Sequence, residues 1–242
     1  MQNYKIVLSY DGTDYSGWQR QPKRRTIQGT LEGVLAGITQ RNISVVGAGR
    51  TDAGVHALGQ AAHFKAAVRM SEAEFRKALN ALLPDDIRVV DLHEVTAEFH
   101  ARRDAKSKTY QYRIWNAPEI SPFLFRYALH VPYPLSLRPM RLAAELFERE
   151  DDFSAFSSNR ELNPRRRVTR SALSRRGKEI IYTIEGSGFL RYMVRTIVGT
   201  LLEIGRGRFA PDDIEELFEN GTRTLASPTA PAKGLSLLKI VY

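Results

Sequence analysis

The residues with the clearest chemical potential form a glycine-rich segment around one carboxylate. Residues 47–57 read Gly-Ala-Gly-Arg-Thr-Asp-Ala-Gly-Val-His-Ala, and Asp52 is the only acidic residue among them. Glycines permit positive φ and let another molecule approach the backbone closely, so this segment can bring a large planar substrate against the carboxylate. A carboxylate in such a position can act as a nucleophile or as a charge stabiliser.

Two common glycine-rich nucleotide motifs do not fit this segment. Gly47 and Gly49 are not followed by a third glycine at the dinucleotide-binding spacing, and no Gly-Lys-Ser/Thr follows as a phosphate loop would require. A hairpin in which Asp52 only caps backbone N–H groups stays open as an alternative. Arg50 does not decide between the two, because Arg–Asp pairs are common on protein surfaces.

Composition predicts a globular protein that suits a polyanionic partner. The 242 residues carry a net charge of +9, most of it due to arginine, which pairs well with phosphate. Because the chain has no cysteine and its five histidines lack metal-binding spacing, we expect no metal. No apolar run reaches membrane-spanning length and the N-terminus does not resemble a signal peptide, so we expect no membrane and a cytoplasmic location.

The elements that must position Asp52 are predicted as alternating strands and helices. Alternating apolar residues predict a strand over 4–10, and Thr26 is a suitable N-cap for a helix with an apolar stripe. The β-branched run 43–46 enters the glycine-rich segment, and 60–64 resumes as a strand. A capping box formed by Ser71 and Glu74 then opens a helix, and a strand over 87–95 follows it. The residues of this helix that are expected to point inward are Phe75, Leu79 and Leu82.

The second half is predicted to repeat this plan. A strand over 106–115 places Tyr112 in the core, and a helix is expected over 139–150. The later elements are strands near 168–175 and 179–185 and a strongly apolar helix over 190–202. The sequence thus predicts an α+β fold with helices on one face of an antiparallel sheet, as in ferredoxin-like and RNA-recognition folds. The expected domains are 1–103 and 104–242.

Two polar stretches each allow two interpretations. In the loop 11–20, Tyr15 and Trp18 either stack on RNA bases or close the end of the core. In the insertion 158–167, Arg165–Arg167 are expected in a loop that is either mobile and RNA-facing or merely solvated. Composition does not choose between these interpretations.

Residues 47–57 are similar to the signature of the tRNA pseudouridine synthase A family, whose catalytic aspartate corresponds to Asp52. Residues 108–112, Lys-Thr-Tyr-Gln-Tyr, resemble a second motif of that family, in which the first tyrosine, here Tyr110, stacks on the target uracil. Residues 188–195 resemble a Gly-Phe-Leu-x-x-Met-Val-Arg pattern whose closing arginine, here Arg195, pairs with the aspartate.

The resemblance extends over nearly the whole chain. It implies two halves that share a central antiparallel sheet, and a terminal strand in which Leu235 or Leu237 packs against the target base. Arg50 would insert into the base stack or bind phosphate as the base flips out. The implied enzyme is a homodimer that isomerises uridines 38, 39 and 40 of the tRNA anticodon stem-loop without a cofactor. Whether Asp52 attacks C6 of the base or C1′ of the ribose stays open.

Two other functions fit these residues less well. A catalytically silent RNA-binding protein of the same fold has no need for an acid inside a basic cleft. A carboxylate-dependent hydrolase of nucleotides or sugars generally needs a second acid or a metal, whereas the glycine-rich segment offers one carboxylate.

Overall fold

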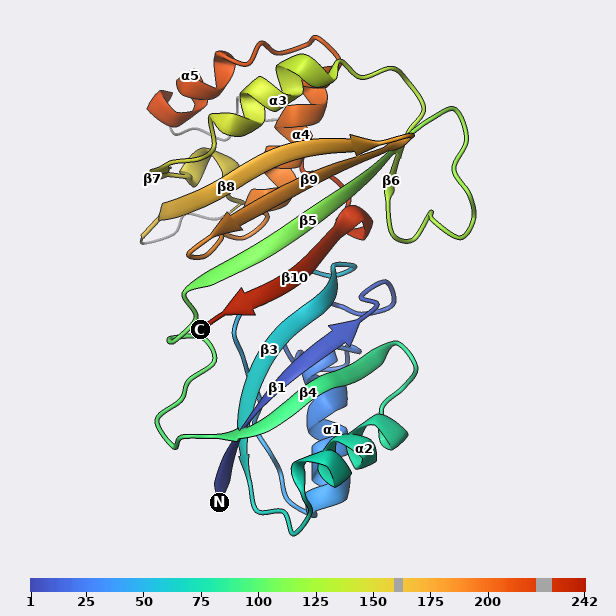
Figure 1. Ribbon diagram of the computed structural model, residues 1–242, viewed down its shortest axis with the longest axis vertical. Coiled ribbons are helices and arrows are strands. Elements are labelled where there is room, and N and C mark those ends of the chain that lie inside the picture. The colour runs from blue at the N-terminus through green and yellow to red at the C-terminus, as the bar shows by residue number, and fades with distance from the viewer. Residues whose placement is uncertain (159–162, 221–227) are drawn as a thin grey trace. The chain divides into compact units, whose positions relative to one another are not determined.

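The computed structural model describes residues 1–158, 163–220 and 228–242, which form two compact units (Figure 1). Unit 1 consists of Met1–Lys106 with Ser236–Tyr242, and unit 2 consists of Ser107–Leu235. A division after residue 103 assigns the last residues of the chain to the second half. In the structure they belong to unit 1, because the terminal strand pairs with a strand of that unit.

Unit 1 is built on a split β-α-β sheet. Strand β1 (Gln2–Tyr10) pairs antiparallel with both β3 (His56–Ala66) and β4 (Ile87–Val95). The short β2 (Val46–Gly47) pairs antiparallel with β3, and β10 (Leu235–Val241) pairs with β3 in parallel. The order β4-β1-β3-β2 is that of ferredoxin-like folds, so the predicted fold class is confirmed.

Two capped helices complete unit 1. The hydroxyl of Thr26 accepts a hydrogen bond from the backbone N–H of Gly29 at the start of α1 (Ile27–Thr39), and the predicted capping box opens α2 (Glu72–Leu82). Leu82 is 59% exposed, so its predicted inward position is wrong. The helix ends there and the next residue, Leu83, turns to an extended conformation and is buried in its place.

The core of unit 1 lies between these helices and one face of the sheet. Alternate residues of β1 are buried, and the rings of Tyr4 and of Phe75 on α2 pack edge to face with 5.5 Å between centroids. The buried members of this alternating face are Tyr4, Ile6, Leu8 and Tyr10. The two-residue period predicted from the sequence therefore identified the core face correctly.

The strands of unit 2 pair antiparallel in the order β5 (Ser107–Asn116), β9 (Glu179–Gly186), β8 (Arg165–Arg176) and β7 (Glu150–Asp152). The short β6 (Leu129–Val131) pairs with β5 in parallel. Alternate residues of β5 and β9, such as Tyr112 and Tyr182, are fully buried. In Figure 1 these strands lie in front of a helix of unit 2 that packs against their buried face.

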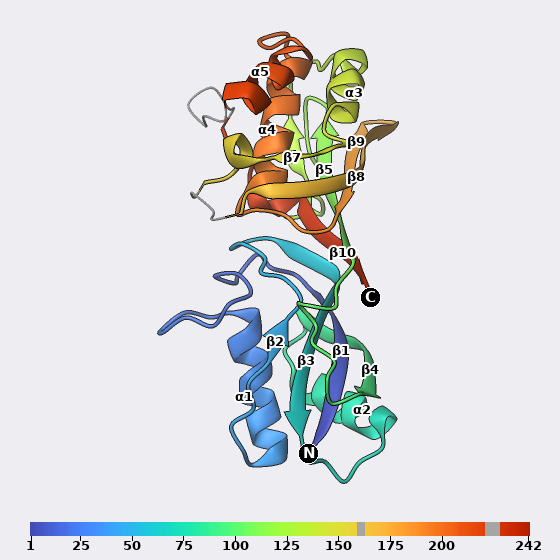
Figure 2. The same cartoon turned by 90° about the vertical axis from the view of Figure 1, so that its left-hand side faces the viewer.

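Helices α3 (Leu137–Glu145) and α4 (Met193–Gly205) lie against that face, and α5 (Asp213–Asn220) lies beside α4 (Figure 2). Helix α3 ends earlier than predicted, because residues 150–152 form β7. Helix α4 starts later than predicted, because Tyr192 has a left-handed backbone with φ of 64°. The predicted apolar stripe of α4 is buried throughout, from Met193 to Leu202.

The prediction of a loop at Arg165–Arg167 is wrong, because these residues begin β8. Each arginine lies opposite an acidic residue of β7: Arg167 faces Glu150, Arg166 faces Asp151, and Arg165 faces Asp152. Opposite charges across neighbouring strands stabilise their pairing, which explains why this charged stretch is a strand. Residues 159–162 of the predicted insertion lie outside the described residues.

We expect Gly47→Ala to destabilise the protein by about 1 to 3 kcal/mol, because added atoms in a packed site force shifts of this cost. A Cβ at Gly47 would lie 2.6 Å from the buried indole ring of Trp18. Gly33→Ala is the control, since a Cβ there meets nothing within 4 Å and α1 should gain about 0.5 to 1 kcal/mol. Urea unfolding measures both, and equal effects would contradict the packing argument.

Candidate active site

Asp52 lies in the loop between β2 and β3, as predicted. Its side chain is partly exposed, while Arg50 is exposed to solvent. The backbone turns directly after Asp52, whose carbonyl accepts a hydrogen bond from the N–H of Val55 at 3.1 Å. Gly54 makes this turn possible, because its φ of +77° lies in the left-handed region that other residues avoid. The loop thus presents one carboxylate at the end of a tight turn.

A second loop, residues 11–20, packs directly against the backbone on both sides of Asp52. The N–H of Trp18 donates to the carbonyl of Thr51 at 3.0 Å, and the N–H of Gly54 donates to the carbonyl of Tyr15 at 3.3 Å. Gly17 allows this contact, because a Cβ there would lie only 2.7 Å from the Thr51 carbonyl oxygen. The two loops therefore hold each other through backbone hydrogen bonds, and these bonds do not require any particular side-chain conformation.

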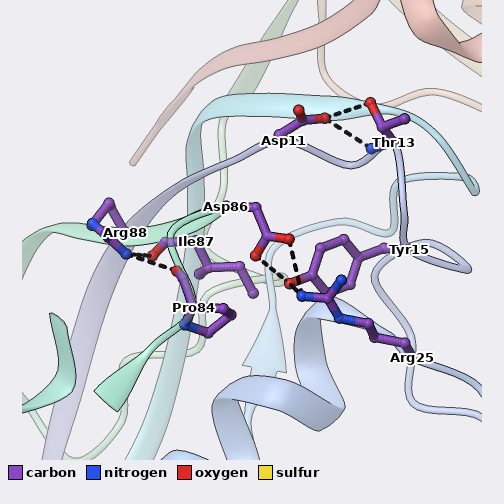
Figure 3. Close-up of polar contacts among 8 residues, drawn as sticks. All are labelled: Asp11, Thr13, Tyr15, Arg25, Pro84, Asp86, Ile87 and Arg88. Atoms are coloured by element: carbon purple, nitrogen blue, oxygen red, sulfur yellow. Dashed lines mark hydrogen bonds and ion pairs between the residues drawn. The ribbon is translucent and has the colours of Figure 1, made fainter. Parts of the chain in front are cut away.

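Tyr15 and Trp18 are core residues, which decides between the two interpretations of their loop. They are 3% and 1% exposed, so neither ring has a free face for a base. The Tyr15 hydroxyl donates to the carboxylate of Asp86 at 2.5 Å, and Arg25 donates to the same carboxylate at 2.9 Å (Figure 3). Burial and the neighbouring Asp86 raise the pKa of Tyr15, so its hydroxyl stays protonated and donates. These contacts tie the loop to the turn before β4.

The start of the same loop is held by Asp11. Its carboxylate accepts from both the N–H and the hydroxyl of Thr13, at 2.9 and 2.6 Å (Figure 3). The Nδ1 atom of His56 lies 3.1 Å from that carboxylate and 3.1 Å from the N–H of Gly12. Without a proton Nδ1 accepts from Gly12, and with one it donates to Asp11. Val55 is the residue whose N–H closes the turn after Asp52. A Cβ on Gly12 would lie only 2.0 Å from the Val55 carbonyl oxygen, so glycine is needed at position 12 for this close approach.

Tyr110 and Tyr112 lie on β5 of unit 2. Tyr110 is 7% exposed, and its ring and that of Phe189 pack edge to face with 5.3 Å between centroids. Tyr112 is fully buried and its hydroxyl donates to the carbonyl of Pro231 at 2.7 Å, so its predicted core position is confirmed. The sequence offered no signal for Phe189 as a neighbour of Tyr110. Phe189 follows β9, and the pairing of β9 with β5 brings it to Tyr110.

Arg195 lies in the first turn of α4, where the surrounding backbone fixes it. Its Nε donates to the carbonyl of Ala230 at 2.7 Å, and the N–H of Ala230 donates to the carbonyl of Arg195 at 3.0 Å. The guanidinium carbon lies 4.9 Å from the centroid of the Tyr192 ring. Sequence reasoning missed Ala230 and Tyr192 as orienting residues, since the first is far along the chain and the second is a variable position of the motif.

The remaining candidates alternate along the terminal strand. Leu235 is 5% exposed and Leu237 is fully buried, and their spacing of two places them on the same face of β10. Asp52, Arg50 and Leu237 belong to unit 1, whereas Tyr110, Arg195 and Leu235 belong to unit 2. The pairing of Asp52 with Arg195 therefore stays a prediction.

Across residues 1–158, 163–220 and 228–242, no group of three His, Asp or Glu side chains is arranged to hold a metal ion. In the same part of the chain, no helix is both long and apolar enough to cross a membrane.

Comparison with known proteins identifies a family. Residues 6–104 and 143–242 match the profile of a family described as tRNA pseudouridine synthase. A tRNA pseudouridine synthase A from Thermodesulfovibrio yellowstonii is 45% identical over 254 residues, with 100% of both chains covered. Its counterpart from Caldicellulosiruptor saccharolyticus is 44% identical over 244 residues with the same coverage. The one from Geobacillus kaustophilus is 44% identical, covering 100% of this chain and 95% of the relative.

Asp86→Ala should lower the free energy of unfolding by about 1 to 3 kcal/mol, because it removes a charged acceptor from the hydroxyl of buried Tyr15. The adjacent Asp85→Ala is a matched control, since the Asp85 side chain is fully exposed and pairs with Arg88 at the surface. Its effect should stay within about 0.5 kcal/mol. Urea denaturation of both variants tests this, and a silent Asp86→Ala would show that the Tyr15 contact does not anchor the loop.

Proposed function

This chain belongs to the tRNA pseudouridine synthase family and is an isomerase that modifies tRNA, and we propose that it acts on uridines 38, 39 and 40 of the anticodon stem-loop through Asp52. The observation that carries the role of Asp52 is its place in a loop whose backbone is held on both sides by residues 11–20. A lone carboxylate on so firmly held a turn suits a reaction that needs one precisely placed group.

The proposed reaction moves one bond without net oxidation or hydrolysis. The N1–C1′ bond of uridine breaks, the freed uracil turns, and C5 joins C1′; C5 loses a proton and N1 finally gains one. Asp52 acts either by attacking C6 of the base or by attacking C1′ of the sugar. Because the product is an isomer of the substrate, and the proton lost from C5 is balanced by the one gained at N1, the proposal requires no cofactor.

The other candidates are assigned roles around the flipped nucleotide. We propose that Arg195 pairs with Asp52 and keeps its carboxylate charged in a desolvated site, since a guanidinium in hydrogen-bond reach offsets the cost of burial. Tyr110 stacks on the target uracil, and Leu235 or Leu237 packs against it. Arg50, which is exposed, enters the base stack or binds phosphate.

The assembly and location are part of the same proposal. The net charge of +9 suits binding of tRNA, whose phosphates attract arginine and lysine. We propose that the enzyme works as a homodimer in the cytoplasm. Gel filtration with light scattering tests the dimer, and a monomer at micromolar concentration would contradict it.

Asp52→Asn should abolish pseudouridine formation and keep tRNA affinity within about tenfold, or 1.4 kcal/mol, because the change removes one charge but little volume. Unmodified tRNA is incubated with wild type or variant, tritium release from 5-tritiated uridine is measured, and pseudouridine is mapped along the anticodon arm. Persistent release would remove Asp52 from the chemistry. Binding without product by the wild type would instead indicate a silent RNA-binding protein, and product outside positions 38–40 would refute the site assignment.

Arg195→Leu should reduce activity far more than tRNA binding, because it leaves the carboxylate of Asp52 without its proposed counter-charge. Arg191→Leu is the matched control: its guanidinium carbon also lies near the Tyr192 ring, at 5.0 Å, but Arg191 precedes α4 and is exposed. Single-turnover rates and binding constants of both variants are compared. Equal losses of rate and binding in Arg195→Leu, or equal rates in the two variants, would count against the pair.

A further inference from the structure

We propose that the buried hydroxyl pair Tyr10–Thr51 positions the catalytic carboxylate, so that both residues are positioning residues for the reaction. This inference rests on the proposed role of Asp52. The Tyr10 hydroxyl and the Thr51 Oγ1 atom lie 2.8 Å apart, and both residues are buried, at 4% and 6% exposure. Thr51 is joined to Asp52 by a single peptide bond.

Thr51 is held by two separate groups. Its side chain meets Tyr10 at the end of β1, inside the sheet of unit 1, while its carbonyl accepts from the N–H of Trp18 in the packed loop. The rings of Tyr10 and Trp18 lie 6.3 Å apart, so both partners belong to one packed cluster. The peptide that leads into Asp52 is therefore fixed in two directions, by the sheet on one side and by the loop on the other.

The protonation state of Tyr10 suits this task over the physiological pH range. Burial raises the pKa of Tyr10 to about 12, although hydrogen bonds to Thr51 and Gln60 oppose the shift. The phenol is consequently neutral at neutral pH, and either hydroxyl of the pair can donate to the other. Removing one hydroxyl leaves the other buried without this partner, which favours a local shift of the loop.

A small rotation of the Thr51–Asp52 peptide displaces the carboxylate. It does not move the exposed arginine and lysine side chains that can bind tRNA phosphates. A misplacement of about 1 Å at a reacting group costs about 100-fold in rate. Loss of the pair should therefore lower kcat and leave the KM for tRNA within about twofold, because substrate affinity comes mainly from phosphate contacts made elsewhere. A merely structural pair would instead lower the melting temperature and leave the kcat of the folded enzyme intact.

The test compares three variants in the full-length enzyme with tRNA as substrate. Thr51→Val replaces the hydroxyl by a methyl group, Tyr10→Phe removes only the phenolic oxygen, and Thr51→Ser restores a hydroxyl. We expect kcat to fall about 10- to 100-fold in the first two and to return to within about threefold of wild type in Thr51→Ser. Kinetics are measured well below each melting temperature. If Thr51→Val does not fold, the kcat of Tyr10→Phe decides.

Unit 2 supplies a matched control. The hydroxyls of Tyr182 and Ser171 lie 2.7 Å apart and are also buried, on β9 and β8, and burial likewise raises the pKa of Tyr182. Tyr182→Phe makes the same chemical change as Tyr10→Phe in a pair to which no role in catalysis is assigned. Its melting temperature should fall by a similar amount, whereas its kcat should equal that of wild type.

Each outcome decides the matter. A normal kcat in Tyr10→Phe, or an equal loss of kcat in Tyr182→Phe, overturns the positioning role; so does failure of Thr51→Ser to restore the rate. Asp52→Asn is assayed in parallel to separate the two proposals. If Asp52→Asn is inactive but Tyr10→Phe is normal, only the positioning role fails, and if Asp52→Asn is active, the proposed function of Asp52 fails.

Discussion

The backbone contact between residues 11–20 and the Asp52 loop is the constraint on which the candidate site in unit 1 depends. Hydrogen bonds join Trp18 to Thr51 and Gly54 to Tyr15, and at Gly17 the two loops approach so closely that a side chain does not fit between them. A loop rich in glycine has much conformational entropy to lose, so it needs such partners to keep one conformation. The flexibility that the composition suggests is thus removed by contact with a second loop.

That second loop is itself anchored in the core. Tyr15 and Trp18 are buried, and the carboxylate of Asp86 receives hydrogen bonds from Tyr15 and Arg25. The anchoring turn precedes β4, whose neighbour β1 ends at Tyr10 beside Thr51. Strand, turn and loop therefore form one connected support for Asp52. In unit 2, Arg195 is oriented in a comparable way, through the backbone of Ala230 and the ring of Tyr192.

Local patterns in the sequence determined most of the elements and the identity of the candidate carboxylate. The alternation over 4–10, the capping box at Ser71 and the apolar stripe of α4 each record burial or capping within a few residues, and the structure confirms them. The glycine-rich signature likewise lies within one short segment. Such features are readable because their physical cause lies within about one helical turn or a few strand residues.

Only the tertiary structure decided what distant residues do to one another. It buried Tyr15 and Trp18, made Arg165–Arg167 a strand opposite the acidic β7, and assigned the terminal strand to unit 1. It also brought Tyr10 to Thr51 across 41 positions and Arg195 to Ala230 across 35. Local periodicity carries no record of these partners, because the energy of a buried hydrogen bond or a cross-strand charge pair depends on separation in space rather than along the chain.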